Sequence, residues 1–263
     1  METETADLRE KYRPKSFGQV LGNRVPKSFL ISSILARKFP KAIINHGITG
    51  TGKTSLAYLT HMGLTCQNFN GDVCGTCKGC RLALKYYPHG FEGVQIYDCL
   101  NLDANRLTEI LRENTNLCCS NRIGRQVLIF DEFHRVAERR LQDKFLRKIE
   151  TCRDLFIFTL IDLSCIEGAF KDRATILKTT PPKMEEVLPW LESICNAERI
   201  IIKEKEALKG LAEESRLIPR SCLGMLQLIL GLKEPITVDL INQLSENRES
   251  AGNDAPTYKV IGD

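Results

Sequence analysis

The sequence contains no apolar run that approaches the ~18 residues needed to span a membrane. Its polar start, METETADLRE, does not resemble a secretory signal. A large net charge is also missing, because 37 Lys and Arg against 33 Asp and Glu give only +4, too little to indicate a nucleic-acid partner. We therefore expect a cytoplasmic protein that does not associate with membranes.

Two further absences concern nucleic-acid recognition and architecture. No basic patch is interleaved with aromatic residues, so we do not expect base stacking or sequence-specific recognition. No internal repeat or low-complexity tract interrupts the 263 residues, a length that suits two domains or one large one. What the sequence does contain is a small number of motifs with specific chemistry.

The most informative motif lies at residues 47–54, which read GITGTGKT and fit the phosphate-loop pattern G-x-x-x-x-G-K-[ST]. Glycines let backbone N–H groups turn towards phosphate oxygens, Lys53 adds a positive charge, and the Thr54 hydroxyl can bind Mg²⁺. A predicted strand at 41–46 and a predicted helix at 55–63 favour this interpretation over a plain glycine-rich turn. The residues expected to hold a nucleoside triphosphate are Gly47, Gly50, Thr51, Gly52, Lys53, Thr54 and Ser55.

A second nucleotide-handling motif follows residues 127–130 (VLIF), an apolar run typical of a central parallel strand. The run ends in Asp131 and Glu132, and α/β sheets bind their ligands at the carboxyl ends of such strands. We expect Asp131 to hold Mg²⁺ and Glu132 to orient and deprotonate an attacking water. The alternative is an acidic pair that caps the start of a helix.

Four of the eleven cysteines are grouped in a pattern that suggests a metal site. Cys66, Cys74, Cys77 and Cys80 offer two C-x-x-C steps and one outlying thiol, which suits tetrahedral Zn²⁺ in a structural role. Gly71, Gly75 and Gly79 would allow the tight turns between them. An iron–sulfur cluster and free thiols are the alternatives. The other cysteines mostly adjoin apolar residues, as core-filling cysteines do.

Further strands are predicted at 93–99 and 155–160, with helices at 102–114 and 139–150. This alternation predicts an α/β fold in which helices flank a parallel sheet. After a double proline at 181–182, the pattern becomes wholly helical.

The predicted helices beyond the double proline lie at 184–197, 204–215 and 219–230. We therefore predict an ATP-binding domain and a small C-terminal helical domain followed by a frayed tail. The predicted boundaries are 1–180 for the ATP-binding domain, about 64–84 for its cysteine module, 181–245 for the helical domain and 246–263 for the tail.

These motifs together resemble those of the AAA+ ATPase subunits of DNA sliding-clamp loaders, and most of all the bacterial gamma/tau subunit. Residues 11–22 contain KYRP and FGQVLG, which are similar to the family's signature beside the adenine pocket. That similarity implies that Tyr12 and Arg13 contact the nucleotide. The cysteine insertion after the phosphate-loop helix is the most discriminating similarity. Residues 131–134 (DEFH) fit the family's DExH-type acidic motif, and a basic turn at 122–125 (RIGR) precedes it.

The resemblance, which extends over residues 8–245, also implies roles for two arginines. Arg173 lies where clamp loaders carry Ser-Arg-Cys, although Asp172 replaces the serine and Ala174 the cysteine. It is the candidate arginine finger, which reaches the γ-phosphate held by a neighbouring subunit. Arg220 lies at the start of a helix that resembles the sensor-two helix and would act on the nucleotide of its own chain. The alternative for each is an exposed arginine in a solvated ion pair.

The chain departs from the family's pattern at three points. The polar sensor-one residue expected after the strand at 155–160 corresponds to Leu160 or Ile161, with Thr159 as the candidate if the register is shifted. The family's Glu-Glu-Pro is replaced by Glu-Thr-Cys at 150–152. A third, helical collar domain has no counterpart, so we expect assembly through the ATPase domains and other subunits, or a shortened variant.

The resemblance implies an ATP-dependent subunit that binds and hydrolyses ATP, with Mg²⁺ and structural Zn²⁺, to load a sliding clamp onto primer–template DNA during replication. The expected partners are other clamp-loader subunits in a homo- or hetero-oligomer, the sliding clamp, and DNA bound without sequence specificity. Basic residues that could face DNA, or could be ordinary solvated charges, are Arg106, Arg139, Arg140 and Lys144.

Three other functions compete with this one. A non-hydrolysing, ATP-binding structural subunit is favoured by the missing sensor-one residue and opposed by the intact Lys53, Thr54, Asp131 and Glu132. A zinc-containing nucleoside monophosphate kinase would carry two separated cysteine pairs later in the chain and would lack KYRP. A DExH helicase would need a second motor lobe, for which 263 residues leave no room.

Overall fold

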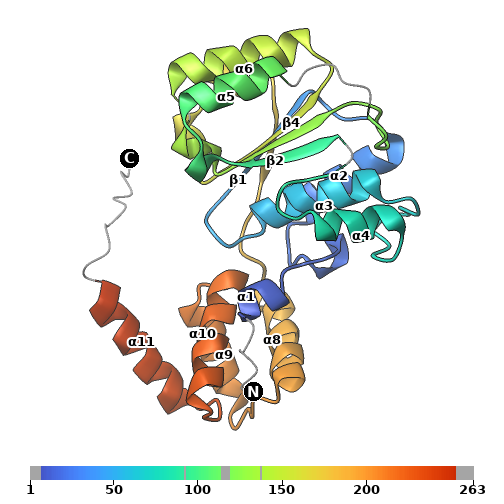
Figure 1. The fold of residues 1–263 in the computed structure, drawn as a ribbon. Helices are drawn as coiled ribbons and strands as arrows, with labels where there is room; N and C mark the ends of the chain where they lie inside the picture. Colours follow the sequence, from blue (N-terminus) through green and yellow to red (C-terminus); the bar gives the residue numbers. More distant parts are fainter. Residues whose placement is uncertain (1–6, 92, 114–118, 137, 253–263) are drawn as a thin grey trace, which may run out of the picture. The chain divides into compact units, whose positions relative to one another are not determined.

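The computed structural model describes residues 7–91, 93–113, 119–136 and 138–252 (Figure 1). They form two compact units: a larger one of residues 13–181, and a smaller one that combines residues 7–12 with residues 182–252. The chain passes from the larger unit to the smaller at Pro181–Pro182. Two successive prolines fix the backbone here and offer no N–H group to a helix or a sheet.

The larger unit is built on a five-stranded parallel sheet with the order β2-β3-β4-β1-β5. The strands are β1 Ala42–His46, β2 Val94–Asp98, β3 Val127–Asp131, β4 Leu155–Leu160 and β5 Thr175–Lys178. Parallel strands need crossover connections, and helices supply them here. Because β4 lies between β1 and β3, the loop that follows β1 and the carboxylates that follow β3 lie on either side of the end of β4.

Helices cover both faces of this sheet. Their bounds are α2 Arg24–Ala36, α3 Lys53–Thr65, α4 Lys78–Lys85, α5 Ala104–Glu113, α6 Arg139–Thr151 and α7 Gly168–Lys171. Ile43 points to the face covered by α2, α3 and α4, whereas the next residue, Ile44, points to the face covered by α5 and α6. Figure 1 shows these two groups of helices on opposite sides of the sheet. Burial on both faces explains why the strands are almost entirely apolar.

Short 3₁₀ helices lie near the N-terminal end and after three of the strands, and one of them is anchored by aromatic packing. They lie at Phe17–Gln19, Cys99–Asn101, Phe133–Arg135 and Leu163–Cys165. The ring of Phe133 lies 4.7 Å from that of Phe158 and 5.2 Å from that of Phe145, between centroids. Phe133 directly follows Glu132, so this buried cluster fixes the backbone on the carboxyl side of the acidic pair.

The basic turn at residues 122–125 is held by hydrogen bonds to backbone carbonyls. Arg122 Nε donates to the Cys66 carbonyl at 2.9 Å. Arg125 donates to the Arg153 carbonyl at 3.0 Å and to the Phe39 carbonyl at 2.9 Å. Both guanidinium groups therefore join segments that are distant in the sequence, which is a structural role.

The smaller unit is helical. Its helices are α1 Leu8–Lys11, α8 Met184–Glu198, α9 Lys205–Glu214, α10 Pro219–Leu232 and α11 Val238–Gly252. The Glu198 carboxylate forms a 2.7 Å ion pair with Lys11 and accepts a hydrogen bond from the Tyr12 hydroxyl, which fixes α1 against α8. Burial and the neighbouring Glu198 carboxylate raise the pKa of Tyr12 to about 12.

The sequence predicted four of the five strands and missed β5 and the helices α1, α2, α4, α7 and α11. Helix α11 continues to Gly252, beyond residue 246, at which we expected the tail to begin; residues 253–263 lie outside the described part. Its first half is fixed by the buried Leu240 and Ile241. Among the described residues, no helix is both long and apolar enough to cross a lipid bilayer.

The phosphate-loop helix α3 contains a fully buried histidine, His61. Its Nε2 lies 3.2 Å from the Phe91 carbonyl oxygen, and burial lowers its pKa to about 4. In the unfolded chain the pKa of a histidine is about 6.5. Between pH 6.5 and about 4, His61 is therefore protonated in the unfolded chain but neutral in the folded protein.

We predict that the free energy of unfolding falls as the pH is lowered from 6.5 to 4, with His61 contributing about 3 kcal/mol of that loss. The variant His61→Leu should have a flatter stability profile over this range, measured by urea unfolding at a series of pH values. The variant His89→Gln, at an exposed histidine, is the control and should retain the wild-type profile. Equal slopes for His61→Leu and wild type would contradict the assignment.

Candidate nucleotide and metal sites

The glycine-rich loop between β1 and α3 folds back on the end of β5. A Cβ atom at Gly47 would lie 2.3 Å from the Thr179 carbonyl oxygen, so only glycine fits at that position. Gly52 has φ 101°, in the region that favours glycine, and directly precedes α3. The Thr51 and Thr179 hydroxyl oxygens are 2.8 Å apart. The loop is thus fixed to the sheet by contacts that tolerate little change in side-chain size.

Lys53 is the first residue of α3, and its side chain points back into the loop. It is only 4% exposed, and its Nζ donates to the carbonyl oxygens of Gly47 at 2.8 Å and Ile48 at 3.0 Å. Ser55, also predicted to bind nucleotide, follows in the first turn of the same helix. The backbone N–H groups of a helix start and an ammonium group together favour an anion at this position.

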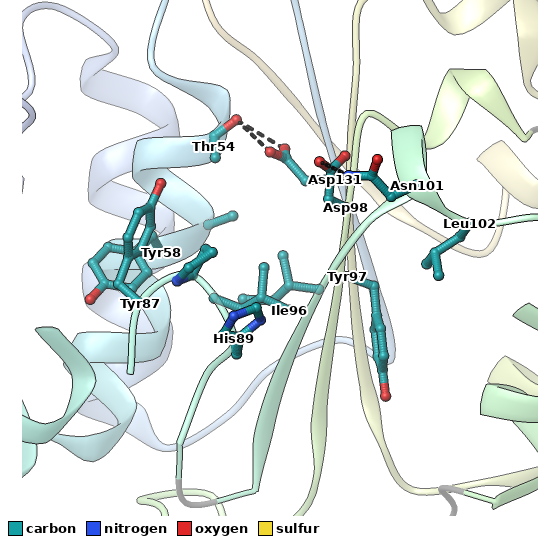
Figure 2. Close-up of a pocket in the computed structure, with 13 residues that line it drawn as sticks. Thr54, Tyr58, Tyr87, His89, Ile96, Tyr97, Asp98, Asn101, Leu102 and Asp131 are labelled. Atoms are coloured by element: carbon teal, nitrogen blue, oxygen red, sulfur yellow. Dashed lines mark hydrogen bonds between the residues drawn. The ribbon is translucent and has the colours of Figure 1, made fainter. Parts of the chain in front are cut away.

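Thr54 and Asp131 meet at the carboxyl edge of the sheet. The Thr54 hydroxyl, from α3, lies 2.9 and 3.1 Å from the two carboxylate oxygens of Asp131, from β3 (Figure 2). Oxygen atoms from a hydroxyl and a carboxylate are the donors that Mg²⁺ prefers. The two residues expected to bind Mg²⁺ are therefore brought together, and their atoms fit that ion.

Glu132 follows Asp131 in a left-handed backbone conformation, with φ 54°. Such a conformation is uncommon for a residue other than glycine and is found at sites where the surrounding structure fixes it. Its N–H donates to the Thr159 hydroxyl at 3.1 Å, and its carboxylate lies 3.5 Å from His134 Nδ1. Burial lowers the pKa of His134, although the Glu132 carboxylate opposes that shift.

Thr159 is the polar residue that the sequence placed only as a secondary candidate. It is fully buried on β4, and its hydroxyl donates to Asp131 and accepts from the Glu132 N–H group. Side chains alternate along a strand, so Leu160, one of the two residues first expected at the sensor-one position, points into the phenylalanine-rich core on the opposite face. Which residue serves as sensor one, Thr159 or Ile161, stays a prediction.

Asn23 is a site residue that the sequence did not indicate. Its Nδ2 donates to the Thr51 carbonyl at 2.9 Å, and its Oδ1 accepts from the Thr180 N–H group at 3.0 Å. It precedes α2 in a left-handed conformation that asparagine tolerates. One amide thus joins the phosphate loop to the segment that leads out of β5. Neither a motif nor a periodicity marks such a long-range contact.

A cavity of about 510 Å³ opens beside the Thr54–Asp131 pair. It lies between α3 and β2 and is lined mainly by aromatic and apolar side chains, including Tyr58, Tyr87 and Tyr97 (Figure 2). Asp98, at the end of β2, contributes a carboxylate that accepts hydrogen bonds from the Leu100 N–H group and the Asn101 side chain. The cavity gives the metal-binding pair access to a half-enclosed space.

The remaining predicted nucleotide residues are divided between the two units. Tyr12 and Arg220 belong to the helical unit, where Arg220 is exposed in the first turn of α10. Arg13 belongs to the larger unit and lies over the ring of Tyr87, 5.2 Å from its centroid. Arg173 is exposed after α7, and its Nε donates to the Glu150 carboxylate at 2.5 Å. The roles assigned to these four residues remain predictions.

The four grouped cysteines converge. The Sγ atoms of Cys66, Cys74, Cys77 and Cys80 all lie within 4.8 Å of one another. Two of the pairs are separated by 3.9 and 4.0 Å. Four thiolates bound tetrahedrally at about 2.3 Å from Zn²⁺ would be about 3.8 Å apart, so the cluster matches the size of such a site.

Backbone hydrogen bonds favour the thiolate form in this cluster. N–H groups of Cys77 and Thr76 lower the pKa of Cys74 to about 6, and the Cys77 sulfur accepts N–H groups from Gln67 and Cys80 at 3.4 Å each. Burial instead raises the pKa of Cys80. Metals bind cysteine in its thiolate form. A bound cation would therefore add to the stabilisation of the thiolate charge that the N–H groups provide.

The cysteine module, residues 66–85, is bonded to the rest of the larger unit. The Asp72 carboxylate accepts from the N–H groups of Phe17 at 2.8 Å and Gly18 at 2.9 Å. The Tyr58 hydroxyl donates to the Ala83 carbonyl at 2.6 Å. The module is therefore an integral part of the face that carries α3.

Of the three glycines assigned to turns between the cysteines, one has another role. Gly71 and Gly75 have φ values of 90° and 70°, as the turn interpretation requires. Gly79 instead lies in α4, where a Cβ atom would be 1.9 Å from the Thr65 carbonyl oxygen. It is needed so that α4 can approach the end of α3.

The sheet order, the loop after β1 and the acidic pair after β3 define a P-loop nucleoside-triphosphatase fold of the AAA+ type. No protein-family model matches the chain. A RuvB structure from Thermotoga maritima superposes with a TM-score of 0.62 at 17% identity, over 90% of this chain and 72% of that one, which supports the fold alone.

The sequence comparisons are more specific. The chain is 26% identical over 238 residues to the DNA polymerase III subunit gamma/tau of Mycoplasma pneumoniae, and 28% identical over 234 residues to that of Mycoplasma genitalium. These matches cover 89% and 86% of this chain but only 34% and 37% of the relatives, so it spans about a third of their length. The chain is therefore a divergent protein of AAA+ fold that is similar to gamma/tau subunits over most of its own length.

The variant Gly79→Ala is expected to reduce the free energy of unfolding by about 1–3 kcal/mol, because the added methyl group overlaps a backbone carbonyl that cannot move freely. Urea unfolding of the purified protein measures this change. The matched control is Gly168→Ala, a helical glycine of the same unit whose Cβ would meet no atom within 4 Å. An equal effect in both variants would rule out the close approach as the cause.

Proposed function

We propose that this chain is an ATP-binding and ATP-hydrolysing subunit of a clamp-loader-type complex that places a ring-shaped clamp on primer–template DNA. The main support is the convergence of Lys53, Thr54, Asp131 and Glu132 at one edge of the sheet, in a chain similar to gamma/tau subunits. In this proposal, binding of ATP favours a state that grips clamp and DNA, and hydrolysis releases both.

Each residue of the site has a distinct task in the proposal. Lys53 would exchange its bonds to the Gly47 and Ile48 carbonyls for phosphate oxygens. Thr54 and Asp131 would hold Mg²⁺, which would neutralise charge on the β and γ phosphates. Glu132 would orient the attacking water and accept its proton, with its backbone fixed by Thr159 and by the packing of Phe133.

Arg173 is proposed to act on the nucleotide of a neighbouring subunit. Its ion pair with Glu150 joins two side chains that are 44% and 51% exposed, and such pairs contribute about 0–1 kcal/mol. Arg173 could therefore leave Glu150 for a phosphate at little cost. Arg220 is proposed to act on the chain's own nucleotide.

The proposed partners are other clamp-loader subunits, in a homo- or hetero-oligomer, the sliding clamp and DNA. DNA would be bound through its phosphates and without sequence specificity. The candidate residues lie on the neighbouring helices α5 and α6, where Lys144 donates to the Thr108 hydroxyl at 2.9 Å and Arg106 pairs with Glu109 at 3.0 Å. Arg139 is 80% exposed and Arg140 is also exposed, so both are accessible to a polyanion.

The cysteine cluster is proposed to hold a structural Zn²⁺. Four sulfur donors leave no position open for a substrate, which argues against a catalytic role. The separations of 3.9 and 4.0 Å between sulfur atoms suit one ion.

The alternative is a subunit that binds ATP without hydrolysing it. The observation in its favour is the contact between Glu132 and His134, which could keep the carboxylate from an incoming water. We propose Thr159 as the sensor-one residue because its hydroxyl donates to Asp131, and with that assignment the sensor-one argument for this alternative falls away.

The variant Glu132→Gln tests the proposed function. Wild-type ATPase activity should rise when a clamp and primed DNA from the same source are added. Glu132→Gln should reduce turnover by about a hundredfold or more while ATP still binds, because it removes the proton acceptor and little else. Glu213→Gln, an exposed glutamate on α9, is the matched control and should behave as wild type.

Tight ATP binding without turnover under any of these conditions would favour the non-hydrolysing alternative.

The same ATPase assay tests the proposed role of Arg173 in a neighbouring subunit. Arg173→Ala should bind ATP normally and lose activity only in the assembled complex, since its target would lie in another subunit.

Purified protein should contain about one zinc ion per chain, measured by elemental analysis. Cys80→Ser should lose the metal and melt at a lower temperature, because the remaining thiols cannot complete a tetrahedral site. The control Cys165→Ser, at a half-buried cysteine outside the cluster, should retain the zinc. Iron with visible cluster absorbance, or no metal in freshly purified protein, would contradict the zinc assignment.

A further inference from the structure

Asn45, the penultimate residue of β1, is an unusual side chain for its position. It is 0% exposed, and neither its Nδ2 nor its Oδ1 has a hydrogen-bond partner among the described residues. Buried amides are normally hydrogen-bonded, because removing them from water without compensation is unfavourable. The other core-facing residues of β1 are apolar, so packing alone would favour an apolar side chain here as well.

The register of the sheet places Asn45 next to the proposed catalytic residues. It lies directly opposite Thr159 on β4. Phe130 lies opposite Phe158, so Asp131 and Thr159 are the next opposing pair, and Asp98 lies opposite Asp131. A row of four polar side chains therefore crosses four adjacent strands at one level, in the order Asp98, Asp131, Thr159 and Asn45.

Asn45 shares a face of the sheet with the other members of this row. Its neighbour two residues back, Ile43, packs in the same core cluster as Ile129 and Ile157, which precede Asp131 and Thr159 by two residues. Because side chains alternate, all three polar residues project to the face covered by α3. Adjacent strands are about 4.8 Å apart, which allows an asparagine amide to reach the Thr159 hydroxyl by side-chain rotation.

Thr159 has an unused position for this contact. A hydroxyl can donate one hydrogen bond and accept two. The donated bond goes to Asp131, and one accepted bond comes from the Glu132 N–H group. A second acceptor position thus remains, for which the Nδ2 group of Asn45 is a suitable donor.

We propose that Asn45 is a positioning residue whose amide donates to the Thr159 hydroxyl when ATP and Mg²⁺ are bound. This inference rests on the proposed ATPase function. Thr54 and Asp131 would hold Mg²⁺ and Lys53 would hold phosphate, so binding would act on Asp131 within the row and on the phosphate loop that follows Asn45. The new bond ties the strand that enters the phosphate loop to the residue that holds Asp131 and Glu132. The unpaired Nδ2 group of Asn45 is the donor available for this bond.

The variant Asn45→Leu, which preserves the side-chain shape, tests this inference first without nucleotide. Removal of an unpaired buried amide should raise the melting temperature by about 2–4 °C. The control is Gln126→Met: Gln126 precedes β3 at the opposite edge of the sheet, is 1% exposed, and also has an unpaired side-chain oxygen. This control should also be no less stable than wild type.

The two variants should then differ in their response to ATP and Mg²⁺. Asn45→Leu should show a smaller nucleotide-induced rise in melting temperature and a kcat about tenfold lower with KM within about twofold, as expected for loss of a supporting hydrogen bond. Gln126→Met should retain both. A third measurement uses ¹⁵N spectra of the Glu132→Gln protein. The side-chain amide signals of Asn45 are assigned by their loss in the Asn45→Leu variant. These signals should shift when ATP and Mg²⁺ are added.

A lower melting temperature of nucleotide-free Asn45→Leu, or unchanged kcat and amide signals, would overturn the inference, because Asn45 would then be a structural residue only. Wild-type protein that does not respond to ATP at all would instead refute the proposed function. The response of the wild-type protein to ATP therefore shows whether the Asn45 inference or the proposed ATPase function has failed.

Discussion

The hydrogen bonds that connect Thr54, Asp131 and Thr159 are the interaction on which the site depends. They join the first turn of α3 to the ends of β3 and β4, three elements that are far apart in the sequence. Since Thr159 also accepts the Glu132 N–H group, the same bonds fix the backbone of the proposed water-activating residue. Most of the surrounding architecture, including the phenylalanine cluster beneath Phe133, can be understood as support for this arrangement.

The features that the sequence predicted correctly have local signals. A glycine-rich loop between a strand and a helix, an apolar run that ends in two acids, and four closely spaced cysteines are each recognisable within about fifteen residues. The missed features depend on contacts between distant segments. β5 is a short edge strand in which only Leu177 is buried, Asn23 bonds to Thr51 and Thr180, and the choice of Thr159 over Leu160 depends on the register of β4.

The two nucleotide-handling motifs and the cysteine cluster share one structural base. Helix α3 begins at the phosphate loop and ends one residue before the first cysteine of the cluster, and its residues fill the core between the sheet and α4. Arg122 and Asp72 then bond this module to the turn before β3 and to the N-terminal segment. A substitution that disturbs the cluster would therefore also affect the position of the helix that presents Lys53 and Thr54.

The positions of the paired segments along the chain suggest an order of folding. All four cysteines lie within one short stretch, so the module can form after closure of small loops. β1, in contrast, pairs only with β4 and β5, which come much later in the sequence. Contacts between distant segments form slowly because loop closure must precede them. During synthesis, the phosphate loop would therefore remain without its sheet neighbours until β4 has emerged, while the cysteine module beside it could already be in place.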